Sequence, residues 1–268
     1  MSSPHAASAG FRAVPPELGG RAGRGWWDAN ATEYLDEHGE FLGPADFCWC
    51  PEGLRERDAH LLGEVTGRDV LEVGAGAGQC SRWLRAHGAR AVATDISAGM
   101  LAAGRRIDDA VGVAVPAVQA DARALPFSGA SFDCVFTAFG AIPFVPDADR
   151  VHAEVARVLR PGGRWVFAVT HPIRWAFPDD PSERGLTAMR SYFDRTPYVE
   201  SDDAGRVVYA EYHRTLGDHV ADVVAAGLVL DSVLEPEWPV GHDRTWGGWG
   251  PVRGALLPGT AIFTAHRP

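Results

Sequence analysis

At residues 70–79 the chain reads Val70-Leu71-Glu72-Val73-Gly74-Ala75-Gly76-Ala77-Gly78-Gln79. Residues 70–73 have the length and branching of a buried strand, and glycine follows at every second position before an apolar-periodic helix begins. Glycine suits such a turn because it adopts backbone conformations that cost other residues energy, and because it lets a ligand approach the backbone. The stretch therefore predicts a ligand-binding turn at the first strand of a parallel sheet, with a nucleotide as the expected ligand.

The spacing of the glycines separates two classes of nucleotide-binding protein. A dinucleotide fingerprint, G-x-G-x-x-G, would need its third glycine at position 79, where the chain has Gln79. The pattern present is E-x-G-x-G-x-G, with Glu72 two residues before Gly74. This pattern resembles class I S-adenosylmethionine-dependent methyltransferases, in which the turn wraps the methionine part of the cofactor. A nicotinamide-dependent oxidoreductase is the disfavoured alternative from another class.

Acidic residues follow the next two predicted strands, 90–94 and 115–120. Asp95 ends the first of them, at a place where a carboxylate can accept hydrogen bonds from both ribose hydroxyls of an adenosine. Its alternative role is to cap the helix predicted at 97–106, but Ser97 is the better cap. Asp121 follows the second strand, and the resemblance implies that it accepts from the adenine amino group. An exposed turn position is the alternative for Asp121.

The resemblance extends over about residues 60–170, with four motifs in order, and implies a full cofactor site. Tyr34 ends a loose W-x-x-x-A-x-x-Y pattern that begins at Trp27 and would cover the methionine end, although simple packing also explains it. Met100 and Ala122 would line the adenine slot, and either could be ordinary core. The expected cofactor-binding residues are Tyr34, Glu72, Gly74, Ala75, Gly76, Gly78, Asp95, Ile96, Met100, Asp121, Ala122 and Phe139.

The remaining pattern implies the rest of an α/β fold. A fourth strand is predicted at 131–139, and an apolar helical stripe leads through Leu159-Arg160-Pro161-Gly162-Gly163 into a fifth at 164–170. A helix at 216–226 precedes two last strands, 228–235 and 260–265. The resemblance implies a Rossmann-like, seven-stranded, mostly parallel sheet in the order 3-2-1-4-5-7-6, with one antiparallel strand and helices on both faces.

The predicted domain organisation is a single methyltransferase domain over residues 25–268. Residues 1–24, rich in Ala, Ser, Pro and Gly, are expected to be a largely disordered tail. Residues 25–66 are expected to form a helical cap that includes a helix around 52–65. Two aromatic-rich insertions, 171–213 and 236–258, are expected to form a lid, with a strand at 207–213.

Composition limits the classes of partner. The formal net charge of −10 argues against a nucleic-acid or anionic membrane surface and favours a small-molecule partner. All 25 basic residues are arginine, which excludes catalysis by lysine. No apolar run approaches the roughly 20 residues needed to span a bilayer. Cys48 and Cys50 have no further ligand cluster, so no metal is expected. We expect a cytoplasmic protein that is a monomer or a homodimer.

The expected reaction is transfer of a methyl group to an O or N atom of a small molecule, and the tryptophan-rich lid favours an aromatic or apolar acceptor. A hydroxyl acceptor would need a base, and a histidine within hydrogen-bond reach can supply one. His171, at the carboxyl end of the fifth strand, is the first candidate and His213 the second, with structural roles as alternatives. An amine acceptor would need no strong base. A cofactor-binding protein of the same fold, with a non-methylating or regulatory function, is the alternative.

Overall fold

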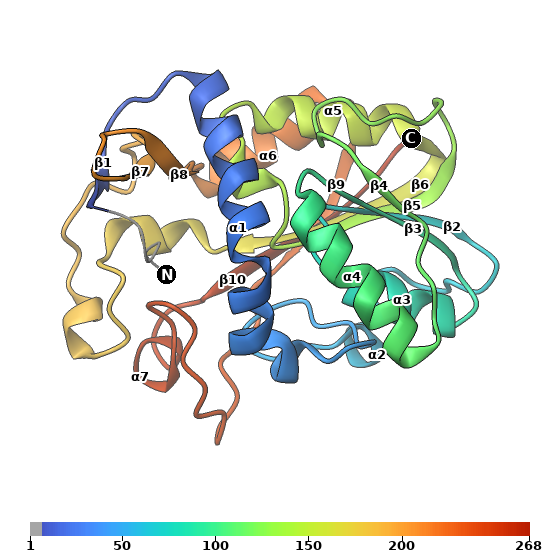
Figure 1. Ribbon diagram of the computed structural model, residues 1–268, viewed down its shortest axis with the longest axis horizontal. Helices are drawn as coiled ribbons and strands as arrows, with labels where there is room; N and C mark the ends of the chain where they lie inside the picture. Colours follow the sequence, from blue (N-terminus) through green and yellow to red (C-terminus); the bar gives the residue numbers. More distant parts are fainter. Residues whose placement is uncertain (1–6) are drawn as a thin grey trace.

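A seven-stranded sheet forms the centre of the molecule, which the computed structural model describes over residues 7–268 (Figure 1). Its strands are β2 (Asp69–Val73), β3 (Arg90–Asp95), β4 (Ala117–Gln119), β5 (Phe132–Ala138), β6 (Leu159–Thr170), β9 (Val229–Leu234) and β10 (Thr260–His266). Their spatial order is β4-β3-β2-β5-β6-β10-β9, which is 3-2-1-4-5-7-6 when these strands are numbered along the chain. β10 runs antiparallel to both neighbours, and β2 to β6 pair in parallel. The predicted fold class is confirmed.

Helices cover both faces of this sheet. Successive side chains of a strand point to opposite faces, so strands with consecutive apolar residues need a cover on each side. On β5, Val135 joins the hydrophobic cluster beneath α5 (Ala148–Val158) and α6 (Leu216–Ala225). The next residue, Phe136, joins the cluster formed by α3 (Gln79–Ala86) and the segment 47–65. The central strands are therefore mostly apolar on both faces, and Glu72 on β2 and Asp95 at the end of β3 are buried polar exceptions.

The longest helix, α1 (Pro16–Leu42), joins the large sheet to a small one. The small sheet consists of β1 (Ser8–Phe11), β7 (Tyr198–Ser201) and β8 (Val207–Glu211), in that order. Figure 1 shows α1 standing between the two sheets. On its other side, Asp28 accepts hydrogen bonds from Ser97 Oγ at 2.7 Å and Gly99 N at 2.9 Å, at the start of α4 (Ala98–Val111). The helix is thereby fixed over the carboxyl ends of the parallel strands.

No helix within residues 7–268 is both long and apolar enough to cross a membrane.

The predicted disordered tail over residues 1–24 is wrong for most of its length. β1 pairs with β7, and α1 begins at Pro16, nine residues before the predicted cap. Proline at the first helical position is favourable because its missing N–H has no helical partner there. One of the small residues serves close packing, because a Cβ on Gly19 would lie 1.8 Å from the Tyr212 hydroxyl. Residues 1–6 lie outside the described residues.

The helix predicted around 52–65 is reduced to the single turn α2 (Glu56–Ala59). The chain leaves the helix at His60, which has a left-handed φ of 48°. Glu56 then turns its carboxylate onto the following backbone, accepting from Leu61 N at 3.0 Å and Leu62 N at 2.7 Å. Trp49 Nε1 also donates to Glu56, at 2.8 Å. These hydrogen bonds to the buried Glu56 side chain take the place of the backbone hydrogen bonds of a longer helix.

Candidate cofactor and acceptor site

The glycine turn packs backbone against backbone with the loop after β5. Gly74, Gly76 and Gly78 all have left-handed φ values, of 67°, 55° and 74°. A Cβ on Gly74 would lie 2.6 Å from Ala141 N, and one on Gly140 would lie 2.2 Å from Gly74 O. The turn therefore needs glycine both for its conformation and for this close approach.

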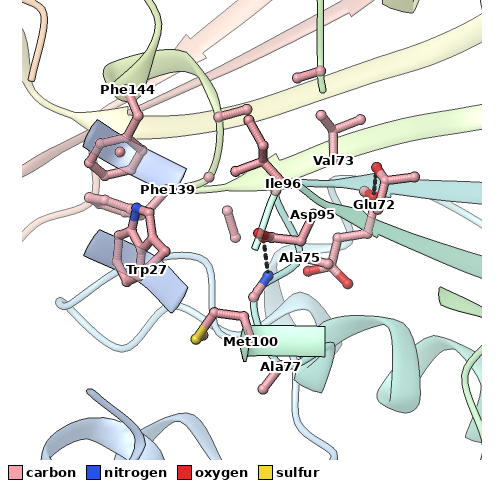
Figure 2. A pocket seen from close by; sticks show the side chains of 18 of the residues that line it. Trp27, Glu72, Val73, Ala75, Ala77, Asp95, Ile96, Met100, Phe139 and Phe144 are labelled. Atoms are coloured by element: carbon pink, nitrogen blue, oxygen red, sulfur yellow. Dashed lines mark hydrogen bonds between the residues drawn. The ribbon is translucent and has the colours of Figure 1, made fainter. Parts of the chain in front are cut away.

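Asp95 holds the turn in place from the end of β3. Its Oδ2 accepts from Gly76 N and its Oδ1 accepts from Ser97 N, both at 2.8 Å. Figure 2 shows the first of these hydrogen bonds. Ser97 caps α4, as predicted, because its Oγ accepts from Met100 N at 3.0 Å. The Asp95 residue is only 9% exposed, and burial raises the pKa of its carboxyl above the usual value. A carboxylate oxygen has a second lone pair, so Asp95 can still accept from a ligand.

Glu72 lies at the other side of the turn, on β2. Its Oε2 accepts from Ser81 N at 3.0 Å and Ser81 Oγ at 2.5 Å, which ties it to the first turn of α3. Burial raises the pKa of its carboxyl to about 7. The site thus holds a carboxyl group that changes charge near neutral pH and that would gain from a cationic neighbour.

A buried arginine supports the turn from below, and sequence reasoning missed it. Arg82 is fully buried and pairs through Nε with Asp108 Oδ1 at 2.5 Å. Its two terminal nitrogens donate to the carbonyl oxygens of Ala77, Pro44 and Gly104. One side chain therefore links the turn, α4 and the segment before α2.

These groups line a cavity of about 1180 Å³, part of which is open to solvent. All of the predicted cofactor-binding residues line it except Gly78, which starts α3 and donates its N–H to Ala75 O at 2.9 Å. The carboxyl groups of Glu72 and Asp95 lie at one side, and Trp27, Phe139 and Phe144 lie at the other (Figure 2). The cavity thus combines an acidic wall with an aromatic one.

Asp121 lines this cavity, but an arginine already engages it. Arg123 donates to Asp121 from Nη2 at 2.7 Å and from Nε at 3.0 Å, and its Nη1 donates to Asp147 at 3.0 Å. These hydrogen bonds lower the pKa of Asp121, so the carboxylate is ionised at neutral pH. The side chain of Asp121 is also 34% exposed. Asp121 therefore combines a place in the cavity wall, which adenine contact requires, with the exposure of a turn residue.

A second cavity of about 1030 Å³ adjoins the first. Its aromatic lining residues are Trp26, Trp27, Tyr34, Phe41, Trp49, Phe139, Phe144, Tyr209, Trp246 and Trp249. The two cavities share Trp27, Tyr34, Leu42, Cys48, Ala138, Phe139 and Phe144. Both predicted lid insertions contribute to its wall, together with α1 and the segment before α2. The aromatic residues of these distant segments therefore line one cavity, called the aromatic chamber below.

The structure does not bring the two candidate bases to these cavities; no histidine of residues 7–268 lines either one. His171 faces the outer edge of the sheet, with Nε2 2.8 Å from Glu235 Oε1 and Nδ1 accepting from Ile173 N at 3.1 Å. His213 lies within the lid, with its Nε2 2.7 Å from Tyr192 O. Burial lowers the pKa of both rings. Neither ring lines the cavities in which an acceptor would lie, and this placement favours the alternative interpretation of both as structural residues.

Comparisons with known proteins agree with this geometry. A family model described as "Methyltransferase domain" matches residues 70–163. The chain is 32% identical over 225 residues to a demethylmenaquinone methyltransferase of Mycolicibacterium paratuberculosis, covering 80% of this chain and 82% of that protein. It is 37% identical over 153 residues to the protein of the same name from Thermus thermophilus, covering 56% of this chain and 64% of that one. A Mycobacterium sp. (strain JLS) relative is matched over 46% of its length, so the chain spans only about half to two thirds of several of its relatives.

Solved structures show the same fold. An S-adenosylmethionine-dependent methyltransferase from Mesorhizobium loti aligns with a TM-score of 0.59 and 26% identity, covering 81% of this chain and 100% of that one. A Burkholderia thailandensis 1,6-didemethyltoxoflavin-N1-methyltransferase aligns with a TM-score of 0.60 at 16% identity, covering 99% of each chain. The chain therefore belongs to the class I S-adenosylmethionine-dependent methyltransferases, whose cofactor is S-adenosylmethionine.

Proposed function

We propose that this protein transfers a methyl group from S-adenosylmethionine to a planar aromatic or apolar small molecule. The observation that carries the proposal is the direct junction of the glycine-turn cavity with the aromatic chamber, through the shared residues Trp27, Tyr34, Phe139 and Phe144. Methyl transfer needs the acceptor and the cofactor in contact within a site that excludes water. Two joined cavities, one with carboxyl groups and one aromatic, would bring cofactor and acceptor into contact, and the aromatic wall would limit the water around them.

The residues of the first cavity fit the cofactor. Glu72 and the glycine turn would hold its methionine end, and Asp95 would accept from the ribose hydroxyls. Asp121 and Ala122 would lie at the adenine, with Met100 beneath it. S-adenosylmethionine supplies an electrophilic methyl group on a sulfonium cation, and a cavity with several carboxyl groups in its wall suits a cation.

The second cavity fits the acceptor. The wall of rings buries flat apolar surface, and edge or face contacts between rings add to that gain. The names of the curated relatives point to a demethylated quinone, so a hydroxylated two-ring aromatic is the first acceptor to test. We propose an O or N atom as the methyl acceptor; a ring carbon is the variant that the relatives' names suggest.

We propose that α1, the small sheet and the loop around Trp246 together act as the lid of a single domain. The rings of Trp246 and His38 stack at 3.8 Å, which connects the loop to α1. Trp26 on α1 lies 5.3 Å from Tyr209 on β8, which connects α1 to the small sheet. An acceptor in the chamber would contact all three parts.

The test is formation of S-adenosylhomocysteine together with a methylated product, followed by mass spectrometry, with phenols, aromatic amines and naphthoquinols as acceptors. We expect turnover with at least one aromatic acceptor and none with matched aliphatic alcohols or amines. Tight binding of S-adenosylmethionine without turnover across the panel would favour the regulatory alternative. Absence of cofactor binding would overturn the proposal.

A further inference from the structure

We propose that Arg174 binds an anionic oxygen, a phenolate or a carboxylate, on the planar acceptor and so orients it in the aromatic chamber. This rests on the proposed function of that chamber as the acceptor site. Arg174 belongs to the 3-10 turn η2 (Pro172–Ala176), which directly follows β6. The carboxyl end of this strand thus delivers a guanidinium, rather than the imidazole of His171, to the chamber wall.

The charged lining of the chamber within residues 7–268 consists of Arg174, Asp179 and Glu211. Each carboxylate already has a hydrogen-bond donor: Asp179 Oδ1 accepts from Gly248 N at 2.7 Å, and Glu211 Oε2 accepts from the Tyr209 hydroxyl at 3.4 Å. Arg174 lies between them, with Nη2 3.7 Å from Asp179 Oδ2 and Nη1 3.8 Å from Glu211 Oε2. These contacts are ion pairs longer than hydrogen bonds.

The guanidinium therefore keeps its donors for a ligand. No hydrogen bond from its nitrogens is formed to any of residues 7–268, although it carries five N–H groups in a planar fork that matches a carboxylate or phenolate oxygen. The flanking carboxylates hold the fork in position. The surrounding rings strengthen its attraction for an anion, because charges interact more strongly beside a low-dielectric wall.

A second observation is that two hydrogen-bond donors in the chamber wall have no partner. The indole N–H groups of Trp26 and Trp249 are buried and have no hydrogen-bond partner within the described residues, and both tryptophans belong to the chamber wall. A buried donor without a partner costs free energy, so a ligand that brings hydrogen-bond acceptors is favoured over one that brings donors. Both observations select an oxygen-bearing ring.

The competing interpretation is that Asp179 and Glu211 bind a cationic amine within the aromatic rings. The two interpretations predict opposite charge preferences for acceptors of equal shape. Isothermal titration of 2-naphthoate and of 2-naphthylmethylamine into protein saturated with S-adenosylhomocysteine separates them. We expect wild type to bind the naphthoate at least 10-fold more tightly than the amine, about the difference that one charged hydrogen bond makes.

Arg174→Gln should weaken naphthoate binding about 10- to 100-fold, because a hydrogen bond to a charged group is lost, and should leave the amine no weaker. Arg174→Lys should recover part of the affinity. Arg195→Gln is the matched control, since Arg195 pairs with Asp218 on the outer surface at 2.6 Å and is not part of the chamber wall. S-adenosylhomocysteine affinity, measured on each variant, reports whether the fold and the cofactor site persist.

Equal or tighter binding of the amine by wild type, or unchanged naphthoate binding by Arg174→Gln with intact S-adenosylhomocysteine binding, would overturn the role of Arg174. Failure of wild type to bind S-adenosylhomocysteine would instead contradict the proposed function. Titration of 2-naphthoate without cofactor would then still measure whether Arg174 binds an anion in the chamber. Failure of the Arg174 proposal and failure of the proposed function can thus be told apart.

Discussion

At the scale of single residues, Asp95 carries two tasks that a substitution can separate. It positions the glycine turn through Gly76 N and starts α4 through Ser97 N, and we assign its remaining lone pairs to the ribose. Asp95→Asn keeps one oxygen acceptor but loses the charge. We expect it to weaken S-adenosylhomocysteine binding about 10- to 100-fold by titration calorimetry, as for the loss of a charged hydrogen bond.

The control is Ser97→Ala, which removes the cap of α4 and should cost about 1 kcal/mol of unfolding free energy. Because Ser97 N still donates to Asp95 in that variant, cofactor affinity should change less than about threefold, which is well under the effect of one charged hydrogen bond. A similar affinity loss in both variants would mean that an intact start of α4, rather than the charge of Asp95, determines cofactor affinity.

We expect Glu72 to make cofactor binding dependent on pH. Burial raises the pKa of its carboxyl to about 7, so the fraction ionised grows as the pH passes through neutrality. An ionised carboxylate attracts the cationic ammonium and sulfonium groups, so S-adenosylmethionine affinity should rise several-fold between about pH 6 and about pH 8. Glu72→Gln should bind more weakly and lose most of this rise in titrations at the two pH values. A rise of equal size in the variant would assign it to another group.

The polar residues of the site could be predicted from sequence wherever a strand end fixes their place. Glu72 and Asp95 line the expected cavity because a parallel sheet aligns its carboxyl ends. The same argument placed His171 at this site, but the chain turns at Pro172 and directs the ring to Glu235, so that His171 lines neither cavity. The direction of a side chain after a strand depends on the following turn, which a strand pattern does not specify. Arg123 was missed for a related reason, since its partner Asp147 is distant in sequence.

At the scale of elements, the glycine turn should tolerate no side chain at Gly74. Alanine there would carry both the strain of a left-handed φ and a Cβ 2.6 Å from Ala141 N. Gly112 is a matched control, because it has a φ of 73° and a Cβ at that position would meet no other atom within 4 Å. In urea unfolding, Gly112→Ala should cost about 1–2 kcal/mol, and Gly74→Ala roughly 3 kcal/mol or more. Equal losses would show that the loop after β5 moves away freely.

Helices and strands could be predicted from the sequence where their apolar residues recur at regular spacing. The strands β2, β3 and β5 have clear apolar patterns and lie within one residue of their predicted bounds, and α5 carries the predicted apolar stripe. β6 begins at Leu159, before its predicted start at 164, so the predicted turn is part of the strand. β1 has no such pattern, because three of its four residues are exposed and its pairing with β7 joins residues far apart in the chain. The prediction for the first half of α1 was wrong for a different reason. Residues 1–24 were expected to be disordered because they are rich in Ala, Ser, Pro and Gly, whereas Gly19 packs closely against Tyr212.

At the scale of the whole molecule, stability against acid should depend on two buried histidines between α5, α6 and the sheet. Burial lowers the pKa of His152 and of His219 to about 3 each. His152 accepts from Trp165 Nε1 at 3.1 Å, and His219 packs 5.3 Å from the ring of Phe263. Both rings are therefore held neutral in an apolar setting, where a positive charge would be poorly solvated.

The sign of the effect follows from proton linkage. In the unfolded chain each histidine takes up a proton below about pH 6.5, whereas in the fold it stays neutral until about pH 3. Between these values the unfolded state binds more protons, so the contribution to stability is fully present above about pH 6.5 and falls as the pH falls. Each ring contributes a slope of up to about 1.4 kcal/mol per pH unit. Buried carboxyls such as Glu72, whose pKa is raised, act in the opposite direction, so the histidine contribution must be isolated by substitution.

His219→Leu isolates that contribution, because leucine fills part of the same space and takes up no proton. Urea unfolding free energies measured from about pH 7.5 to about pH 5 should fall less steeply for this variant than for wild type, by about 1 kcal/mol per pH unit below about pH 6.5. Phe263→Leu changes packing in the same contact without removing a titrating group, so it should lower stability by the same amount at every pH. Parallel pH profiles for wild type and His219→Leu would mean that the fold accommodates a charged His219, and acid sensitivity would then have to arise from His152 or from the carboxyl groups.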